Sequence, residues 1–383
     1  MKTRIGQSIV GAACVLAAIG VVSIASADAG NAGLEKYEPG LSSLLRRQVV
    51  LTLVALAAFL VVVDLDYHFY QRFAPAIYVL TIVLLVLVLV PGIGFSTAKQ
   101  PARRWFRFGG FGFQPSELAK LAVVFSVARY ASMRGAGLGD FKKGLLPGLA
   151  LVALPCFLIG IEVDLGTCLF IAVVGLALLL VAGGNAKHLL AMAGISLPAV
   201  LFVALTRLSH VRSRFEIYLH PEIDPHGKGH QALQSLIAIG NGSLAGLGLG
   251  MGRQKRFFLP EESTDFIFAT IGEEVGFVGC CLIVALFAFL FIQGVRVAFR
   301  ARTSFGALVA LGISCTIGLQ AVANIAVVTA MVPTKGIALP FISYGGSQLV
   351  MMMVMSAVLV NIAGQIDESD VAPTRVAPRE VLA

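Results

Sequence analysis

The feature that most constrains the fold of this chain is a series of ten long apolar runs, each bounded by charged residues or by proline and glycine. A helix needs about 20 predominantly apolar residues to cross the hydrocarbon core of a bilayer. The runs therefore predict an all-α polytopic membrane protein of about ten transmembrane helices, with a large extracytoplasmic loop between helices seven and eight. The predicted spans are residues 6–25, 44–63, 74–90, 114–131, 144–161, 165–182, 187–205, 266–293, 305–332 and 339–362.

The small share of charged residues excludes a soluble protein of this length. Only 13% of the 383 residues are charged, while 57% are hydrophobic. Charged residues make up about 25% of a typical globular domain, so too few are present here to cover a water-exposed surface. We expect one membrane domain over residues 1–364, which includes the large loop at 207–264, and a disordered cytoplasmic tail at 365–383.

Two interpretations fit the first apolar run. Lys2 and Arg4, the run itself and Ala25-Ser26-Ala27 together resemble a cleavable signal peptide, whose removal would leave nine spans. The run is about 20 residues long, which exceeds the usual hydrophobic region of a signal peptide. We therefore favour a first helix that is retained.

The distribution of Lys and Arg indicates the orientation. An even number of spans places both termini on one side of the membrane. With the termini inside, the cytoplasmic segments carry 13 Lys and Arg residues and the outer segments carry 15, or 8 when the long loop is set aside. Long loops cross the membrane largely regardless of their charge, so this count favours cytoplasmic termini. It also leaves an unusual set of cations on the outer side.

An acidic residue at the start of the eighth span is the strongest candidate for chemistry. Ser263 or Thr264 can cap this helix, and Asp265 lies in its first turn, where the helix dipole favours a carboxylate. Helical spacing places Asp265 on the same face as a stripe of small residues that ends at Gly276, which indicates a packed face and a carboxylate directed into the protein. Ionisable residues at membrane depth are functional candidates. The alternative is an acid that only stabilises the start of the helix.

Two further acids follow in the same span. Glu273 and Glu274 lie about 12 Å beyond Asp265 along the helix, and charge at that depth is costly unless it is paired or neutralised. The candidate partner is Lys120, in the fourth span. Lys120 also lies three residues after Glu117, so these two side chains can instead neutralise each other. We expect all four charges to have structural or supporting roles.

The second outer loop concentrates cations and aromatic residues. It contains Arg103, Arg104 and Trp105, which is the one Trp of the chain, within residues 99–110. Guanidinium groups bind phosphate oxygens through paired hydrogen bonds, and Trp favours the membrane interface. The loop therefore suits a diphosphate that lies between a lipid and a sugar, and the alternative is an ordinary interfacial belt.

Two other outer segments contribute candidate substrate-binding residues. The large loop supplies Arg212 and the neighbouring polar residues Gln234 and Ser235. Residues 333–347 contain two prolines and three glycines, together with Lys335 and Ser343. Irregular backbone at this depth is tolerated only when it is buried in protein or lines a wet cavity. Lys335 therefore adds one more cation beside a predicted outer cavity.

Taken in order, these segments resemble the SEDS family (shape, elongation, division and sporulation) of bacterial cell-wall proteins. The resemblance covers about residues 91–361, and it is closer to the division branch, FtsW, and its sporulation relative SpoVE than to the elongation branch, RodA. Gln348 and Val163 depart from the pattern of the division branch. The matching motifs are Arg103-Arg104-Trp105, Gln114-Pro115-Ser116-Glu117 with Lys120, Asp164-Leu165-Gly166-Thr167, Gln234-Ser235, Leu259-Pro260-Glu261, Thr264-Asp265-Phe266-Ile267-Phe268-Ala269 and the segment from Pro340 to Ser347.

This resemblance implies a peptidoglycan glycosyltransferase that polymerises lipid II at the outer face of the bacterial cytoplasmic membrane during septal cell-wall synthesis. In the matching mechanism, Asp265 is the general base of an inverting reaction. Arg103 and Arg104, with Lys335 or Arg212, hold the departing undecaprenyl pyrophosphate. A divalent cation (Mg²⁺ or Mn²⁺) is an optional helper whose ligands the sequence does not identify, and no organic cofactor is expected.

The expected partners are lipid II, a class B penicillin-binding protein transpeptidase and other divisome proteins, with no nucleic acid. Two alternative functions remain at this stage. A lipid II flippase would use intramembrane charges to guide the headgroup and would form no bond. A divisome scaffold would serve mainly to hold the transpeptidase.

Overall fold

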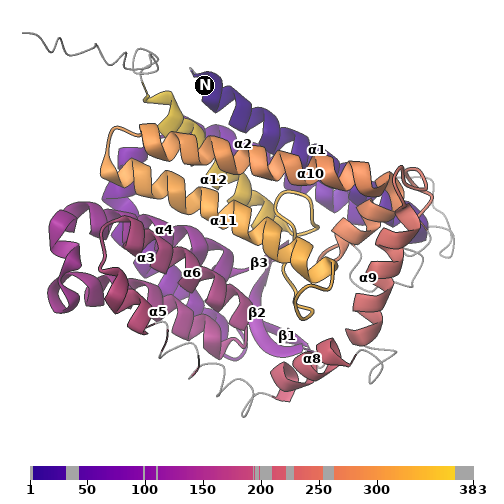
Figure 1. The fold of residues 1–383 in the computed structure, drawn as a ribbon, viewed down its shortest axis with the longest axis horizontal. Helices are drawn as coiled ribbons and strands as arrows, with labels where there is room; N and C mark the ends of the chain where they lie inside the picture. Colours follow the sequence, from indigo (N-terminus) through magenta and orange to yellow (C-terminus); the bar gives the residue numbers. More distant parts are fainter. Residues whose placement is uncertain are drawn as a thin grey trace, which may run out of the picture.

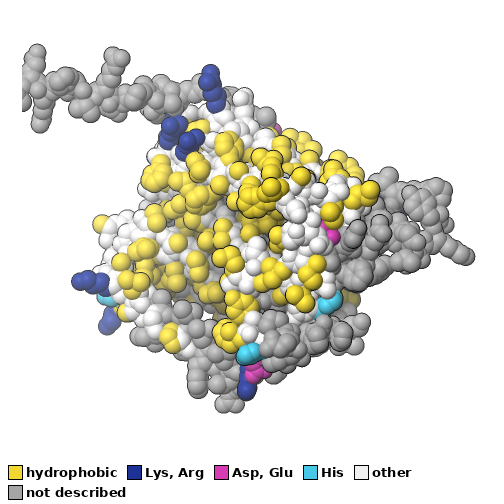
Figure 2. Space-filling view, turned by 45° about the vertical axis from the view of Figure 1, so that its right-hand side comes forward, with side chains coloured by type: hydrophobic (Ala, Val, Ile, Leu, Met, Phe, Trp, Pro, Cys, Tyr) yellow, Lys and Arg dark blue, Asp and Glu magenta, His cyan; other side chains and the backbone are white. Residues whose placement is uncertain are grey.

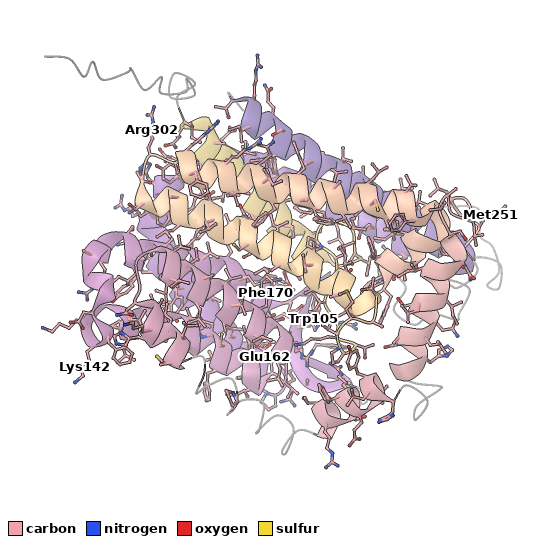
Figure 3. The ribbon with its side chains drawn as sticks, in the orientation of Figure 1. Trp105, Lys142, Glu162, Phe170, Met251 and Arg302 are labelled. Atoms are coloured by element: carbon pink, nitrogen blue, oxygen red, sulfur yellow. The ribbon has the colours of Figure 1, made fainter. Side chains whose placement is uncertain are left out.

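The computed structural model describes residues 3–31, 43–97, 100–108, 111–192, 194, 198, 209–220, 228–252 and 263–366. Most of the predicted span at 187–205 and the tail from residue 367 lie outside these residues. The described chain forms a bundle of long helices with a small sheet and two short helices near one end (Figure 1). Figure 3, which adds the side chains to the same view, shows Lys142 and Arg302 at one end of this bundle and Met251 at the other.

The long helices confirm the membrane class predicted from the apolar runs. Seven helices of the described residues are long and apolar enough to cross a membrane, and the apolar α6 is shorter. Large hydrophobic side chains are exposed on the bundle surface (Figure 2). The helices of the bundle are α1 (Arg4–Asn31), α2 (Ser43–Val63), α3 (Tyr67–Leu89), α4 (Pro115–Arg134), α5 (Leu146–Ile161), α6 (Leu165–Val181), α10 (Ile267–Arg300), α11 (Ser304–Val328) and α12 (Gly346–Gly364). The total of ten spans remains a prediction.

Helix α4 lies inside the bundle, where it contacts α3, α5, α6, α11 and α12. Most of its residues are buried, and these include the polar side chains of Ser116, Glu117, Lys120 and Ser126. Because protein rather than lipid surrounds α4, polar groups in it can find partners. A 3₁₀ turn (Gly135–Gly139) and a π-helical turn (Phe141–Leu145) connect α4 to α5.

Helix α10 is broken at Gly276, which has φ 70° and ψ −171°. The predicted span over residues 266–293 matches this helix from residue 267 on, and the break was not predicted from the sequence. The break frees backbone groups, and the segment after α9 (Lys228–Gly242) satisfies them: Leu247 N donates to Glu273 O, and Phe277 N donates to Ser243 O. A side chain at residue 276 would collide with this segment, so glycine is required for both its conformation and its small size.

The segments predicted to lie on the outer side contain secondary structure that the predicted all-helical class omits. Strands β1 (Phe95–Thr97), β2 (Gln100–Phe108) and β3 (Phe111–Phe113) form an antiparallel sheet in the order β1-β2-β3. Phe95 pairs with Trp105, and Phe106 pairs with Phe113. In the large loop, α8 (Ser209–Leu219) and α9 lie at the same end of the bundle as this sheet (Figure 1).

Candidate functional site

Asp265 lies two residues before α10 begins, against the irregular segment that joins α11 to α12. A Cβ placed on Gly336 of that segment would lie 2.9 Å from Asp265 Oδ2. The buried amide of Asn324 on α11 donates to the backbone oxygen of Asp265 at 2.8 Å and to Ile337 O at 2.6 Å. One side chain thus holds both Asp265 and the segment that contacts it.

Ser343 reinforces the same connection from the other side of the segment. Its hydroxyl donates to Thr264 O at 2.6 Å and accepts from Leu339 N at 2.7 Å, and Tyr344 N donates to Ser263 O at 2.9 Å. The predicted span at 339–362 is therefore wrong at its start, because α12 begins only at Gly346. Ser343, predicted to bind substrate, uses its hydroxyl to position the backbone next to Asp265.

The turn between α5 and α6 forms a second part of the site. Asp164 caps α6 by accepting from Thr167 N at 3.3 Å and from the Thr167 hydroxyl at 2.8 Å. Arg104 on β2 donates to Glu162 O at 3.0 Å and to Val163 O at 2.7 Å. Val163 has φ 63°, which is unfavourable for a β-branched residue and typical of a functionally constrained turn.

Lys335 joins the two parts of the site. Its ammonium end lies directly against the backbone of Gly166, in the first turn of α6, so a Cβ on Gly166 would collide with it. Burial lowers the pKa of Lys335, whereas the carboxylate of Asp164 raises it and Arg214 lowers it further. The segment beside Asp265 and the α5–α6 turn therefore face each other across Lys335.

Glu162 was not among the predicted site residues. Its side chain is 1% exposed, and neither carboxylate oxygen has a hydrogen-bond partner among the described residues. Burial raises the pKa of Glu162 to about 8, Asp164 raises it as well, and Arg104 opposes both effects. The signal in the sequence was an acid in the short interval between two apolar runs. Figure 3 shows Glu162 and Trp105 between the two ends of the bundle.

Other residues predicted to bind substrate lie on β2 and α9. Arg103 donates to Leu89 O at 3.4 Å, and the ring of Trp105 packs on Gly112 within the sheet. Ser235 is fully buried and donates to Val328 O at 2.7 Å, which fixes α9 to α11. Gln234, next to it on α9, is partly exposed. Ser235 therefore serves packing in this structure.

Arg212 lies on the outward face of α8. Its guanidinium pairs with Glu216 at 2.9 Å, and its side chain is 70% exposed. The same helix places Arg214 inward, where Arg104, Asp164 and Asp265 influence it electrostatically. The structure thus brings Arg214 to the site, although the sequence analysis selected Arg212.

The intramembrane charges form a supporting network. Lys120 lies 2.8 Å from Glu117 and donates to Gln320 Oε1 at 2.7 Å. Gln320 and Gln348 then both donate to Ala338 O at 3.0 Å. Of the two partners considered for Lys120, the structure shows Glu117 in the same helix rather than the acids of α10. The network instead connects α4 to the segment beside Asp265.

Glu273 and Glu274 belong to a separate contact region near the break in α10. The hydroxyl of Ser26 on α1 donates to Glu274 at 2.7 Å and accepts from Gly250 N at 3.1 Å. Both carboxylates converge on Gly252, where a Cβ would lie 2.9 Å from Glu273 Oε2 and 3.2 Å from Glu274 Oε1. These acids therefore connect α1, α10 and the glycine-rich residues 246–252 that follow α9.

The described residues contain no group of three or more His, Cys, Asp or Glu side chains that could hold a metal ion. Lys335 and Arg214 interact electrostatically with Asp164, and these cations favour an anion beside it.

Comparison with known sequences finds a matching family and relatives whose names agree with that family. The profile of the FtsW/RodA/SpoVE family, described as "Cell cycle protein", matches residues 7–368. The probable peptidoglycan glycosyltransferase FtsW of Geobacter sp. (strain M18) is 39% identical over 351 residues, which cover 92% of this chain and 94% of the relative. Stage V sporulation protein E of Bacillus subtilis (strain 168) is 38% identical over 318 residues, which cover 83% and 86%.

Two solved structures share the fold. A chain from the structure described as "Structural coordination of polymerization and crosslinking by a peptidoglycan synthase complex" has a TM-score of 0.74 at 25% identity, covering 93% of this chain and 96% of that chain. The rod shape determining protein RodA of Thermus thermophilus has a TM-score of 0.65 at 25% identity, covering 92% and 95%. These matches confirm the predicted fold class.

Proposed function

Because the chain belongs to the FtsW/RodA/SpoVE family of cell cycle proteins, we propose that it is a peptidoglycan glycosyltransferase that polymerises lipid II at Asp265. The observation that carries the site assignment is the position of the Asp265 carboxylate. It lies against Gly336, one residue from Lys335, and Asn324 holds its backbone. A carboxylate next to a cation-bearing segment can serve as a base beside an anionic leaving group.

In the proposed reaction, Asp265 takes the proton from the 4-hydroxyl of the acceptor N-acetylglucosamine. The freed oxygen attacks C1 of the donor N-acetylmuramic acid, while the bond from C1 to the diphosphate oxygen breaks. Undecaprenyl pyrophosphate leaves with that electron pair, and the configuration at C1 inverts. The protein does not need to form a covalent intermediate.

Cations near Asp265 stabilise the negative charge that develops on the leaving diphosphate. Lys335 lies in the adjacent segment, and Arg104 uses two guanidinium nitrogens to hold the α5–α6 turn. A guanidinium has five N–H donors, so Arg104 retains donors for a phosphate. Arg103, Trp105 and Gln234 remain proposed contacts of the headgroup. A divalent cation (Mg²⁺ or Mn²⁺) would add positive charge at the diphosphate, where one or two carboxylates together with phosphate oxygens suffice to hold it.

The proposed setting is the bacterial cytoplasmic membrane at the division septum, with both termini in the cytoplasm. The proposed partners are a class B penicillin-binding protein transpeptidase and other divisome proteins. One structural neighbour comes from a complex whose description couples polymerization to crosslinking, and crosslinking is the reaction expected of a transpeptidase. This likeness supports the transpeptidase partner.

Polymerisation of lipid II by purified protein in detergent tests the proposal. The wild type, with and without the transpeptidase, should form glycan oligomers, and Asp265→Asn should form none. Oligomers made without a bilayer require an enzyme, so they exclude a function limited to flipping. Loss of product on Asp265→Asn with an intact partner complex excludes a function limited to scaffolding. Chain growth by Asp265→Asn at the wild-type rate would overturn the assignment of the base.

A further inference from the structure

Helix α8 has two chemically different faces. Arg212, Phe215, Glu216 and Leu219 are exposed. Arg214 is partly buried, Ile217 is 8% exposed, and the Tyr218 hydroxyl donates to Met331 O at 2.9 Å. Residues three and four apart share a helix face, so this inward face begins at Arg214.

The hydrogen bond of Tyr218 positions Arg214 relative to the site. Met331 precedes Lys335 by four residues in the segment between α11 and α12. Because Tyr218 follows Arg214 by one helical turn, the anchor that fixes Tyr218 also holds Arg214 on the side of α8 that faces this segment. Arg212 lies about 200° around the helix and is excluded from this side.

The guanidinium of Arg214 is partly unsatisfied. Within the described part of the chain, its Nε is buried and has no hydrogen-bond partner. A guanidinium stays charged in proteins, and a buried N–H without an acceptor is costly. An incoming anion would supply the missing acceptor.

Other cations meet Arg214 from separate elements. Burial lowers the pKa of Arg214, the guanidinium of Arg104 on β2 lowers it further, and the carboxylates of Asp164 and Asp265 raise it. Arg214 in turn lowers the pKa of Lys335. Three mutually repelling cations, from β2, α8 and the α11–α12 segment, therefore lie within electrostatic range of one another, and Arg214 is also within range of Asp164 and Asp265. Repulsion of this kind is relieved when an anion binds among the cations.

We propose that Arg214 is the residue through which the large extracytoplasmic loop binds the diphosphate of the lipid-linked substrate. This inference rests on the proposed function, because it assigns a further binding residue to the same site. Arg214 provides paired N–H donors that fit two phosphate oxygens, and Asp164 balances its charge when no diphosphate is bound. The substrate-binding role predicted for Arg212 is thereby assigned to Arg214, the inward-facing arginine two residues later.

Equilibrium binding of undecaprenyl pyrophosphate to the purified full chain tests this assignment. Arg214→Gln and Arg212→Gln each remove one positive charge from the same helix, so they form a matched pair. We expect Arg214→Gln to weaken binding at least tenfold, Arg212→Gln to change it less than twofold, and Arg214→Lys to give an intermediate affinity. Undecaprenol, which has no phosphate, should bind to all variants equally and thereby reports on the fold.

Equal affinities of Arg214→Gln and Arg212→Gln for undecaprenyl pyrophosphate would overturn the inference. If Arg214→Gln fails to fold, Arg214→Lys decides the question, because an unchanged affinity of that variant would show that the guanidinium fork is not used. Undecaprenyl pyrophosphate is a product and is not turned over, so this measurement does not depend on catalysis by Asp265. Failure of the base assignment would appear only in the polymerisation assay.

Discussion

The carboxylate of Asp265 rests against the Cα of Gly336, so that any Cβ at residue 336 would approach Oδ2 to 2.9 Å. Observed Cβ atoms essentially never come this close to another heavy atom. A side chain at residue 336 must therefore move either the carboxylate or the segment that contains it. The segment is held by Asn324 and Ser343, so the carboxylate is the group that yields.

Gly336→Ala should lower the rate of lipid II polymerisation at least about tenfold while the protein remains folded, since small displacements of a reacting group are costly in catalysis. The measurement is the rate of glycan formation by purified protein. Gly345→Ala is the matched control, because the nearest atom to its Cβ would be Gln348 Oε1 at an ordinary 3.5 Å. Equal rates for the two variants would show that the position of Asp265 is not critical.

Gly166→Ala should displace the ammonium of Lys335 without removing its charge, because the new Cβ would occupy the place of the Lys335 side-chain end. Loss of a charge-assisted hydrogen bond costs about 1.5–3 kcal/mol, so we expect the affinity for undecaprenyl pyrophosphate to fall about tenfold or more. Gly160→Ala, at the end of α5, places its Cβ more than 4 Å from any atom of the described residues outside its own helix and should bind normally. Normal binding by Gly166→Ala would exclude Lys335 from the diphosphate site.

Lys120→Met should strongly destabilise the protein, because it leaves the carboxylate of Glu117 buried without its partner at 2.8 Å. Removing one member of a buried ion pair costs about 3–5 kcal/mol, whereas replacing both members by uncharged residues is often nearly neutral. The double variant Glu117→Gln/Lys120→Met should therefore recover most of the lost free energy of unfolding. Denaturation in detergent measures the free energy of unfolding of both variants.

The exposed pair of Arg212 and Glu216 provides the control for this cycle. Surface ion pairs contribute little, so Arg212→Met should change the free energy of unfolding by no more than about 0.5 kcal/mol. If the double variant were as unstable as Lys120→Met, the loss would arise from the contact of Lys120 with Gln320 rather than from an uncompensated charge.

The spans were largely predictable because the apolar signal is local to each segment. Nine of the ten predicted spans coincide with described helices within several residues at most ends. The break at Gly276 was not predictable in the same way, since it depends on contacts with residues 243–248, which are distant in the sequence. The same reason explains why residues 339–345 are irregular: Ser343 bonds to Thr264 rather than continuing a helix.

Two features of the site had signals in the sequence that were missed. Phe106, Phe108, Phe111 and Phe113 alternate around Gly109-Gly110, a pattern typical of a β-hairpin, and β2 pairs with β3 in this register. Arg212 and Glu216 have the i,i+4 spacing of a surface ion pair, which indicates that Arg212 faces outward. The role of Arg214 was not readable from spacing alone, because Asp164, Asp265 and Arg104 reach it from other parts of the chain.

The buried carboxyl of Glu162 predicts a pH dependence of stability. Its pKa rises from an ordinary 4.5 to about 8 in the folded protein. Between these two values the folded state holds a proton that the unfolded chain has released. The free energy of unfolding therefore falls as the pH rises from 4.5 to 8, by about 1.4 kcal/mol for each pH unit within the window, and this contribution is constant above it.

Glu162→Gln should remove this dependence, because the amide is uncharged at every pH. The measurement is the free energy of unfolding of the wild type and the variant in detergent from pH 5 to pH 9. Relative to the wild type, the variant should gain stability steadily up to about pH 8. Glu216→Gln, which changes an exposed carboxylate on α8, should follow the wild-type curve. A constant difference between Glu162→Gln and the wild type would mean that Glu162 is ionised throughout, with a cation beside it in the folded protein.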